Sequence, residues 1–146
     1  MEIQFSIFGN HKDPLGNPLP KLKMIGRQSW TPKAQNYGDW KRFVQAQFYQ
    51  RLDTVAIDNV RSIQSMVSYG MIDYIGPKPL TIPEGFKARM DLKIWWRNDA
   101  HGDPENVFGS IADALFKNDK NLAGSFDFEE KKGRGVVYVT IKFIPL

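Results

Sequence analysis

Three stretches of the chain alternate between apolar and polar residues, a pattern that predicts half-buried β-strands. They are EIQFSIF at residues 2–8, FKARMDLKIWWR at residues 86–97 and VVYVTIKFI at residues 136–144. A shorter strand is predicted within AGSFDFE at residues 123–129. The glycine- and lysine-rich EKKGRG that follows it is typical of a turn, so we expect the last two strands to pair as an antiparallel hairpin.

Two other stretches have apolar residues at intervals of three and four, which predicts helices. The first helix is expected over residues 32–52, with Thr31 as N-cap, Pro32 at the first position and a weak point at Gly38. The second begins after Asp103, which can cap it, with Pro104 and Glu105 in its first turn. The apolar stripe of this second helix consists of Phe108, Ile111, Ala112 and Leu115.

The order of the predicted elements is strand, helix, insertion, strand, helix, strand, strand. Residues 9–30 are expected to form a long loop, and a loop of that length in a compact domain is usually functional or mobile. Residues 54–82 have no clear periodicity and are interpreted as an insertion. The fold class is therefore α/β (α+β): a single domain over residues 1–146, with a mixed sheet and two main helices.

Composition removes several classes of chemistry. The chain of 146 residues has no cysteine, so disulfides, thiolate zinc sites and cysteine nucleophiles are excluded. Only two histidines are present, His11 and His101, which leaves aspartate and glutamate as the obvious catalytic or metal-binding residues. The N-terminus has no signal-peptide pattern, and no stretch approaches the roughly 18 apolar residues of a membrane span. We expect a cytoplasmic protein that does not bind membranes.

The net charge of +4 is concentrated near the N-terminus. Residues 11–42 contain seven lysines and arginines against two aspartates. This excess has two interpretations: a solvated loop and helix surface, or a surface that contacts nucleic acid.

The acidic segment at residues 103–119 also has two interpretations. Asp103 and Glu105 are good helix-start residues, and together with Asp119 they are also hard oxygen ligands of the kind Mg²⁺ prefers. The segment follows a strand, the position at which open α/β sheets place ligands. Asn106 and Asp113 are seven residues apart and should share one face of the helix. Asp119 can join the other acids only if the chain folds back, or if residues 118–122 pass along the sheet beside them.

The same segment resembles the core motif of the RusA-type Holliday-junction resolvases. That family has Asp-x-Asp-Asn, an apolar helix with Asp-Ala-Leu, a short gap, an Asp-Asp pair, and then a strand and a Lys/Gly-rich turn. This chain has DPEN at residues 103–106, DAL at 113–115, ND at 118–119 and KKGRGVVYVTIKF after them. The resemblance extends to the first strand, the basic Pro-rich loop and TPKAQNYGDWKRFVQ, and covers about 110 of the 146 residues.

The resemblance implies a Mg²⁺-dependent endodeoxyribonuclease, with Mn²⁺ as the alternative ion, that acts as a homodimer in DNA recombination and repair. Its substrate would be branched DNA, in the form of a four-way junction, and its source a phage or prophage. The catalytic acids and metal ligands would fall on Asp103, Glu105 and Asp119. From their place on the helix, Asn106 and Asp113 are expected to support this site. A catalytically impaired DNA-binding protein and a phage protein unrelated to DNA are the competing functions.

Three residues depart from the family pattern. The second acid is Glu105 in place of Asp, the first member of the Asp-Asp pair is Asn118, and the family's helix lysine falls on Gly109. Lys117 or Lys120 could take the role of that lysine. These changes are what keep the impaired alternative open.

DNA binding is expected to be mostly electrostatic. The predicted phosphate contacts are Lys21, Lys23, Arg27, Lys33, Lys131, Lys132 and Arg134. Trp95 and Trp96 are predicted to pack, one in the core and one against a helix or a dimer partner, and His101 is interpreted as incidental.

Overall fold

The structure is a computed structural model that describes residues 2–22, 31–58, 79–82, 84–118, 120–130 and 133–146. Most of the predicted insertion, residues 59–78, lies outside the described residues. So do Asp119 and four of the predicted DNA contacts: Lys23, Arg27, Lys131 and Lys132.

Each predicted element in the described part of the chain is present. The strands are β1 (Glu2–Phe8), β2 (Phe86–Trp96), β3 (Leu122–Glu130) and β4 (Val136–Pro145), and the helices are α1 (Pro32–Asp58) and α3 (Pro104–Leu115). Helix α1 passes Gly38 without a break and extends six residues beyond the predicted end at residue 52. Among the described residues, no helix is both long enough and apolar enough to cross a membrane.

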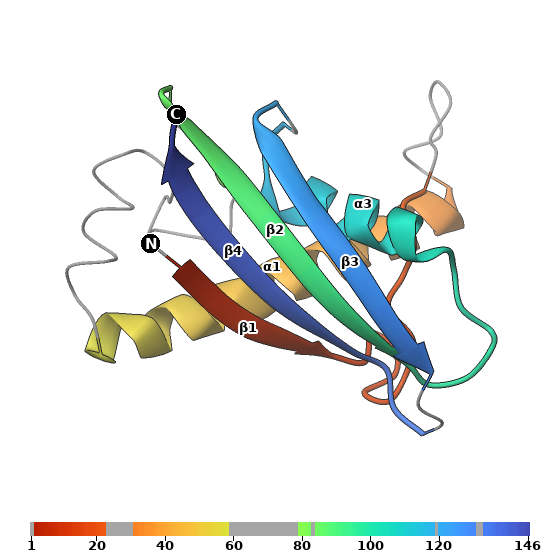
Figure 1. Ribbon diagram of the computed structural model, residues 1–146. Helices are drawn as coiled ribbons and strands as arrows, with labels where there is room; N and C mark the ends of the chain where they lie inside the picture. Colours follow the sequence, from red (N-terminus) through yellow and green to blue (C-terminus); the bar gives the residue numbers. More distant parts are fainter. Residues whose placement is uncertain (1, 23–30, 59–78, 83, 119, 131–132) are drawn as a thin grey trace.

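The strands form one mixed sheet in the order β1-β4-β2-β3 (Figure 1). Strand β4 is antiparallel to both β1 and β2. Strand β3 is parallel to β2, and α3 is the connection between them. Helices α1 and α3 lie together on one face of the sheet (Figure 1). The predicted α+β domain with a mixed sheet is therefore confirmed.

The predicted hairpin of the last two strands is wrong, because β2 lies between β3 and β4. The register of β2 with β4 extends from Phe86 opposite Pro145 to Trp95 opposite Val136. That pairing places the buried side chains of both strands on the face of the sheet that the helices cover. Residues 123–129 of β3 are all exposed, so β3 lies at the edge of the sheet. Burial of two strongly alternating strands outweighed the proximity of β3 and β4 in sequence.

The core lies between the sheet and the two helices. Trp40 and Phe48 from α1, and Ile111 from α3, are almost fully buried against the sheet. The Trp40 indole N–H donates to the hydroxyl of Ser110 at 3.1 Å and joins α1 to α3. This bond satisfies a donor that would be costly to leave unpaired in the interior.

The two adjacent tryptophans pack on opposite faces of β2, as the strand alternation requires. Trp96 is fully buried, and its ring stacks on His101 with centroids 3.8 Å apart. Trp95 packs edge-on against Tyr138 on the helix-free face. The prediction that one of the two packs in the core is confirmed, and that one is Trp96. The described partner of Trp95 is a neighbouring strand, where a helix or a dimer partner had been expected.

Candidate active site

The acidic segment begins with a well-formed helix cap. Asp103 has extended backbone angles (φ −65°, ψ 135°), and its Oδ1 accepts the backbone N–H of Glu105 at 2.9 Å. The predicted N-cap is therefore confirmed, with Pro104 as the first helical residue. Asp103 and Glu105 are both exposed. The cap uses one carboxylate oxygen of Asp103 and leaves the other available to a ligand.

A groove of about 490 Å³ follows the outer face of α3. Glu105 and Asn106 line it near the start of the helix, and Lys117 and Asn118 line it beyond the end. The remaining wall residues are Lys21, Phe108, Gly109, Ala112, Asp113, Phe116, Leu122, Ala123 and Gly124. Asn106 and Asp113 do share one face, as their spacing predicted. The groove therefore combines carboxylates, amides and lysines beside an exposed sheet edge.

Asp113 is engaged by helix α1. Its carboxylate accepts the hydroxyl of Tyr37 at 2.8 Å, and the ammonium of Lys41 lies 3.6 Å away. Burial raises the pKa of Tyr37 well above its usual range, and the hydrogen bond to Asp113 raises it further. The phenol is thus a permanent donor near neutral pH, and Asp113 holds α1 against α3. Its described basic partner, Lys41, comes from α1.

The residues on either side of Asp119 lie at the far end of α3 from Asp103. The helix has 12 residues, which at 1.5 Å per residue is about 18 Å. Leu80 forms a bridge beyond its end, where Lys117 N–H donates to Leu80 C=O at 2.8 Å. Asn121 then accepts the N–H of Ala88 at the start of β2. Among the described residues, no group of three acids or histidines is arranged to hold a metal ion.

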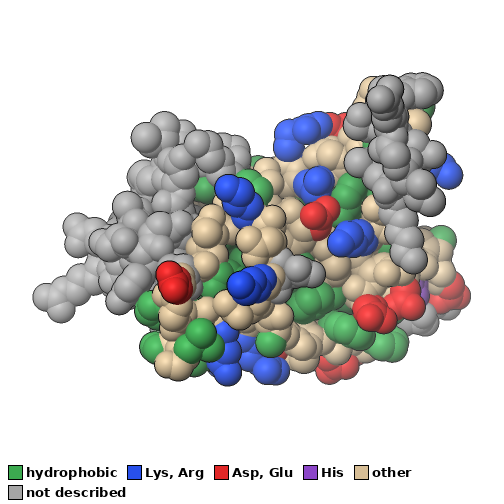
Figure 2. Space-filling model, turned by 90° about the horizontal axis from the view of Figure 1, so that it is seen from above, with side chains coloured by type: hydrophobic (Ala, Val, Ile, Leu, Met, Phe, Trp, Pro, Cys, Tyr) green, Lys and Arg blue, Asp and Glu red, His purple; other side chains and the backbone are tan. Residues whose placement is uncertain are grey.

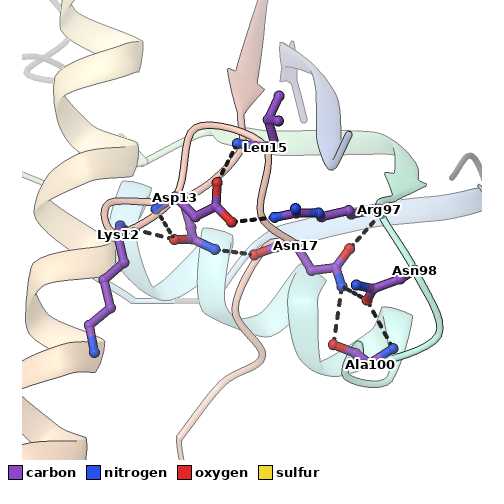
Figure 3. A network of polar contacts seen from close by, with 8 residues as sticks. Lys12, Asp13, Leu15, Asn17, Arg97, Asn98 and Ala100 are labelled. Atoms are coloured by element: carbon purple, nitrogen blue, oxygen red, sulfur yellow. Dashed lines mark hydrogen bonds and ion pairs between the residues drawn. The ribbon is translucent and has the colours of Figure 1, made fainter. Parts of the chain in front are cut away.

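The loop after β1 is tied to the segment that precedes α3 (Figure 3). Arg97 binds the carboxylate of Asp13, and its backbone N–H donates to Asn17 Oδ1 at 2.6 Å. The Asn17 amide donates to Asn98 Oδ1 at 2.9 Å and to the carbonyl of Ala100 at 3.1 Å. These contacts join residues about 80 positions apart in sequence and fix the loop beside the start of α3.

The same loop then crosses α3. The hydroxyl of Ser110 donates to Leu19 C=O at 2.6 Å, and Lys21 N–H donates to Asn106 C=O at 2.7 Å. The stem of Lys21 lies over Gly109, the position at which the RusA-type helix lysine falls. Sequence reasoning proposed Lys117 or Lys120 for that role. Lys117 lines the groove and Lys120 is not among its wall residues, whereas Lys21 comes from a loop that no local pattern connects to α3.

The other described basic candidates lie outside the groove walls. Lys33 is in the first turn of α1, and Arg134 lies over the ring of Phe8, 4.5 Å from its centroid. In the view of Figure 2, lysine and arginine side chains are interspersed with acidic ones and form no continuous patch among the described residues. Lys21 is therefore the one predicted DNA contact that the described structure places beside the acidic segment.

Ser110 is expected to be a sensitive position, because its buried hydroxyl serves α1 and the loop at once. Ser110→Ala would leave the Trp40 N–H and the Leu19 C=O without this partner. We expect a loss of about 1–3 kcal/mol in the free energy of unfolding, measured by urea denaturation. Ser6→Ala on the helix-free face of β1 is the control and should change stability by less than about 0.5 kcal/mol. Equal stability of the two variants would contradict the idea that the Ser110 hydroxyl stabilises the fold by joining α1 and the loop to α3.

Comparison with known proteins adds no assignment. No model of a known protein family matches the chain, and no curated protein is significantly similar to it. The RusA-type interpretation therefore depends on the motif at residues 103–119 and on the groove beside it.

Proposed function

We propose that this protein is a Mg²⁺-dependent endodeoxyribonuclease of the RusA type that cuts four-way DNA junctions. The observation that carries the proposal is the groove along α3, whose walls include Glu105, Asn106, Lys21 and Lys117, with the cap carboxylate of Asp103 bonded to the backbone of Glu105. A nuclease has to hold a polyanion against carboxylates, so cations must lie beside the acids to offset repulsion. This groove has Lys21 and Lys117 in its walls.

The donor set suits a hard divalent cation. Asp103 has one carboxylate oxygen outside the cap, and Glu105 makes no ion pair with another described residue. These oxygens, with the amide oxygen of Asn106 in support, are of the kind Mg²⁺ selects. The bound ion would supply a water of lowered pKa and neutralise charge on the phosphate during an in-line displacement. Asp103 and Glu105 would hold the ion, Asn106 would orient a carboxylate, and Asp119 would be the third acidic ligand.

We further propose that the third acid comes from a second copy of the chain. This proposal is supported by the described neighbours of Asp119, which lie at the end of α3 away from Asp103. Strand β3 is an edge strand whose Phe126 and Phe128 are 41% and 52% exposed, an unusual edge for a monomer. A homodimer that joins two β3 edges would cover them.

Antiparallel pairing of β3 with its copy about Phe126 suits the sequence. It places Ser125 opposite Asp127 and Gly124 opposite Phe128, so that no two acids oppose each other. It also places the start of the second copy's β3 beside the end of the first, where Glu130 pairs with Trp96 ahead of α3. The second copy's Asn118 and Lys120 would then approach Asp103, together with the acid that lies between them in sequence.

The catalytically impaired alternative has some support. Asp103 is already engaged as a cap, and the second acid is Glu105 with its longer side chain. Such a protein would bind junctions without cutting them.

A nicking assay separates the two functions. With Mg²⁺, a synthetic four-way junction should be cut at symmetric positions, and a linear duplex of the same sequence should remain intact. EDTA should abolish cutting, because the ion supplies the activated water, while junction binding in a gel-shift assay persists. Junction binding without cutting in Mg²⁺ or Mn²⁺ would establish the impaired alternative.

A further inference from the structure

We propose that Lys21 contacts the substrate phosphate inside the groove, as a substrate-binding catalytic residue delivered to α3 by the loop after β1. This inference rests on the proposed function. It goes beyond general DNA binding because it assigns one side chain to the phosphate beside Glu105.

The main chain around Lys21 is held at several points. Leu19 C=O accepts from Ser110, and Lys21 N–H donates to Asn106 C=O. Between them, Pro20 packs against Gly102, where a β-carbon would come within 2.7 Å of the proline ring. A side chain that starts from an anchored backbone loses less conformational entropy when it binds a ligand. The strap at residues 19–21 therefore presents Lys21 at a defined place on α3.

Gly109 makes room for the lysine stem. A β-carbon there would lie 3.3 Å from Lys21 Cδ and 3.6 Å from Lys21 Cβ. Glycine in the interior of a helix is unfavourable relative to alanine. Here it lets the aliphatic part of Lys21 lie close against the helix, as lysine stems do on apolar surfaces, and Lys21 is also a wall residue of the groove.

The charges in the groove also single out Lys21. Of its two described carboxylates, Asp113 is already engaged by Lys41 and Tyr37. Glu105 lies in the first turn of α3, next to the residue whose carbonyl anchors Lys21. Lys117 follows the other end of the helix. Among the described groove residues, Lys21 is thus the cation anchored nearest the acidic start of α3, where phosphate must approach.

Lys21→Met tests the proposal, because it keeps most of the stem and removes the charge. We expect the rate of junction cutting in Mg²⁺ to fall by at least about 100-fold, as when one preorganised charge-stabilising group is lost. The log–log salt slope of junction binding, measured in EDTA, should become shallower by about 0.9, the value of one phosphate contact. The thermal midpoint should not change, since the anchoring bonds of residue 21 come from its backbone.

Two further variants complete the experiment. Lys87→Met removes an exposed lysine on the helix-free face of β2. It should alter neither the cutting rate nor the salt slope. Lys21→Met/Gly109→Lys returns an ammonium to the same place from the helix and should recover part of the lost rate. If Lys21→Met leaves the salt slope unchanged, the proposal for Lys21 is overturned, even if the wild type cuts nothing. A wild type that cuts nothing overturns only the proposed function. An unchanged cutting rate in Lys21→Met also overturns the proposal.

Discussion

Asp103→Asn is expected to reduce Mg²⁺-dependent cutting of a four-way junction by at least about 100-fold, the scale of losing one charge-stabilising group in an active site. The carboxylate oxygen outside the helix cap is the one available to the ion, and an amide oxygen is a weaker ligand for a hard divalent cation. Asparagine caps helices about as well as aspartate. The variant should therefore keep α3, the fold and junction binding while it loses turnover.

The control for Asp103→Asn is Asp99→Asn. Asp99 is an exposed acid in the loop that joins β2 to α3, so the same change of charge occurs four residues earlier. It should cut at the wild-type rate. Gel-based initial rates, with thermal midpoints for all three proteins, provide the comparison. Cutting by Asp103→Asn at the wild-type rate would remove this residue from the proposed metal site.

Mixing two inactive variants should restore activity if the site is shared between subunits. Asp103→Asn and Asp119→Asn are each expected to be inactive alone. In a mixed dimer, one of the two sites receives Asp103 from one chain and Asp119 from the other, and is intact. With random exchange, half of the dimers are mixed, and each mixed dimer has one intact site out of two. Nicking should therefore recover to about a quarter of the wild-type rate.

The informative control for the mixture is Asp103→Asn with Glu105→Gln. Both changes lie at the start of α3, so in a shared site no combination of these chains is intact. Unfolding and refolding the chains together ensures exchange, and nicks are counted on denaturing gels. If Asp103→Asn and Asp119→Asn together stay as inactive as each alone, the site is not shared. Phe128→Lys, which places a charge on the exposed β3 edge, should give a monomer in sedimentation and lose cutting as well.

The elements of the fold could largely be predicted from sequence because their signals are local. Alternation located β2 within one residue of its observed end, and the Asp103-Pro104 pair located the start of α3. The same local signals misplaced the last strand pair. A turn-like sequence shows that a chain can reverse, but not whether the reversed strand pairs with its neighbour. That choice followed from which faces could be buried together, and β2 took the place beside β4.

The features of the candidate site also divide into those set by local sequence and those set by tertiary packing. The sequence by itself determined that an acid caps α3, that Glu105 and Asn106 follow it, and that Asn106 and Asp113 share a face, because cap chemistry and helical periodicity act over a few residues. Only the tertiary structure decided that Asp113 accepts a hydrogen bond from Tyr37 of α1 and that Lys21 lies over Gly109. Both contacts join segments more than 70 residues apart, and their stabilisation comes from burial and hydrogen bonds that exist only after the layers have packed.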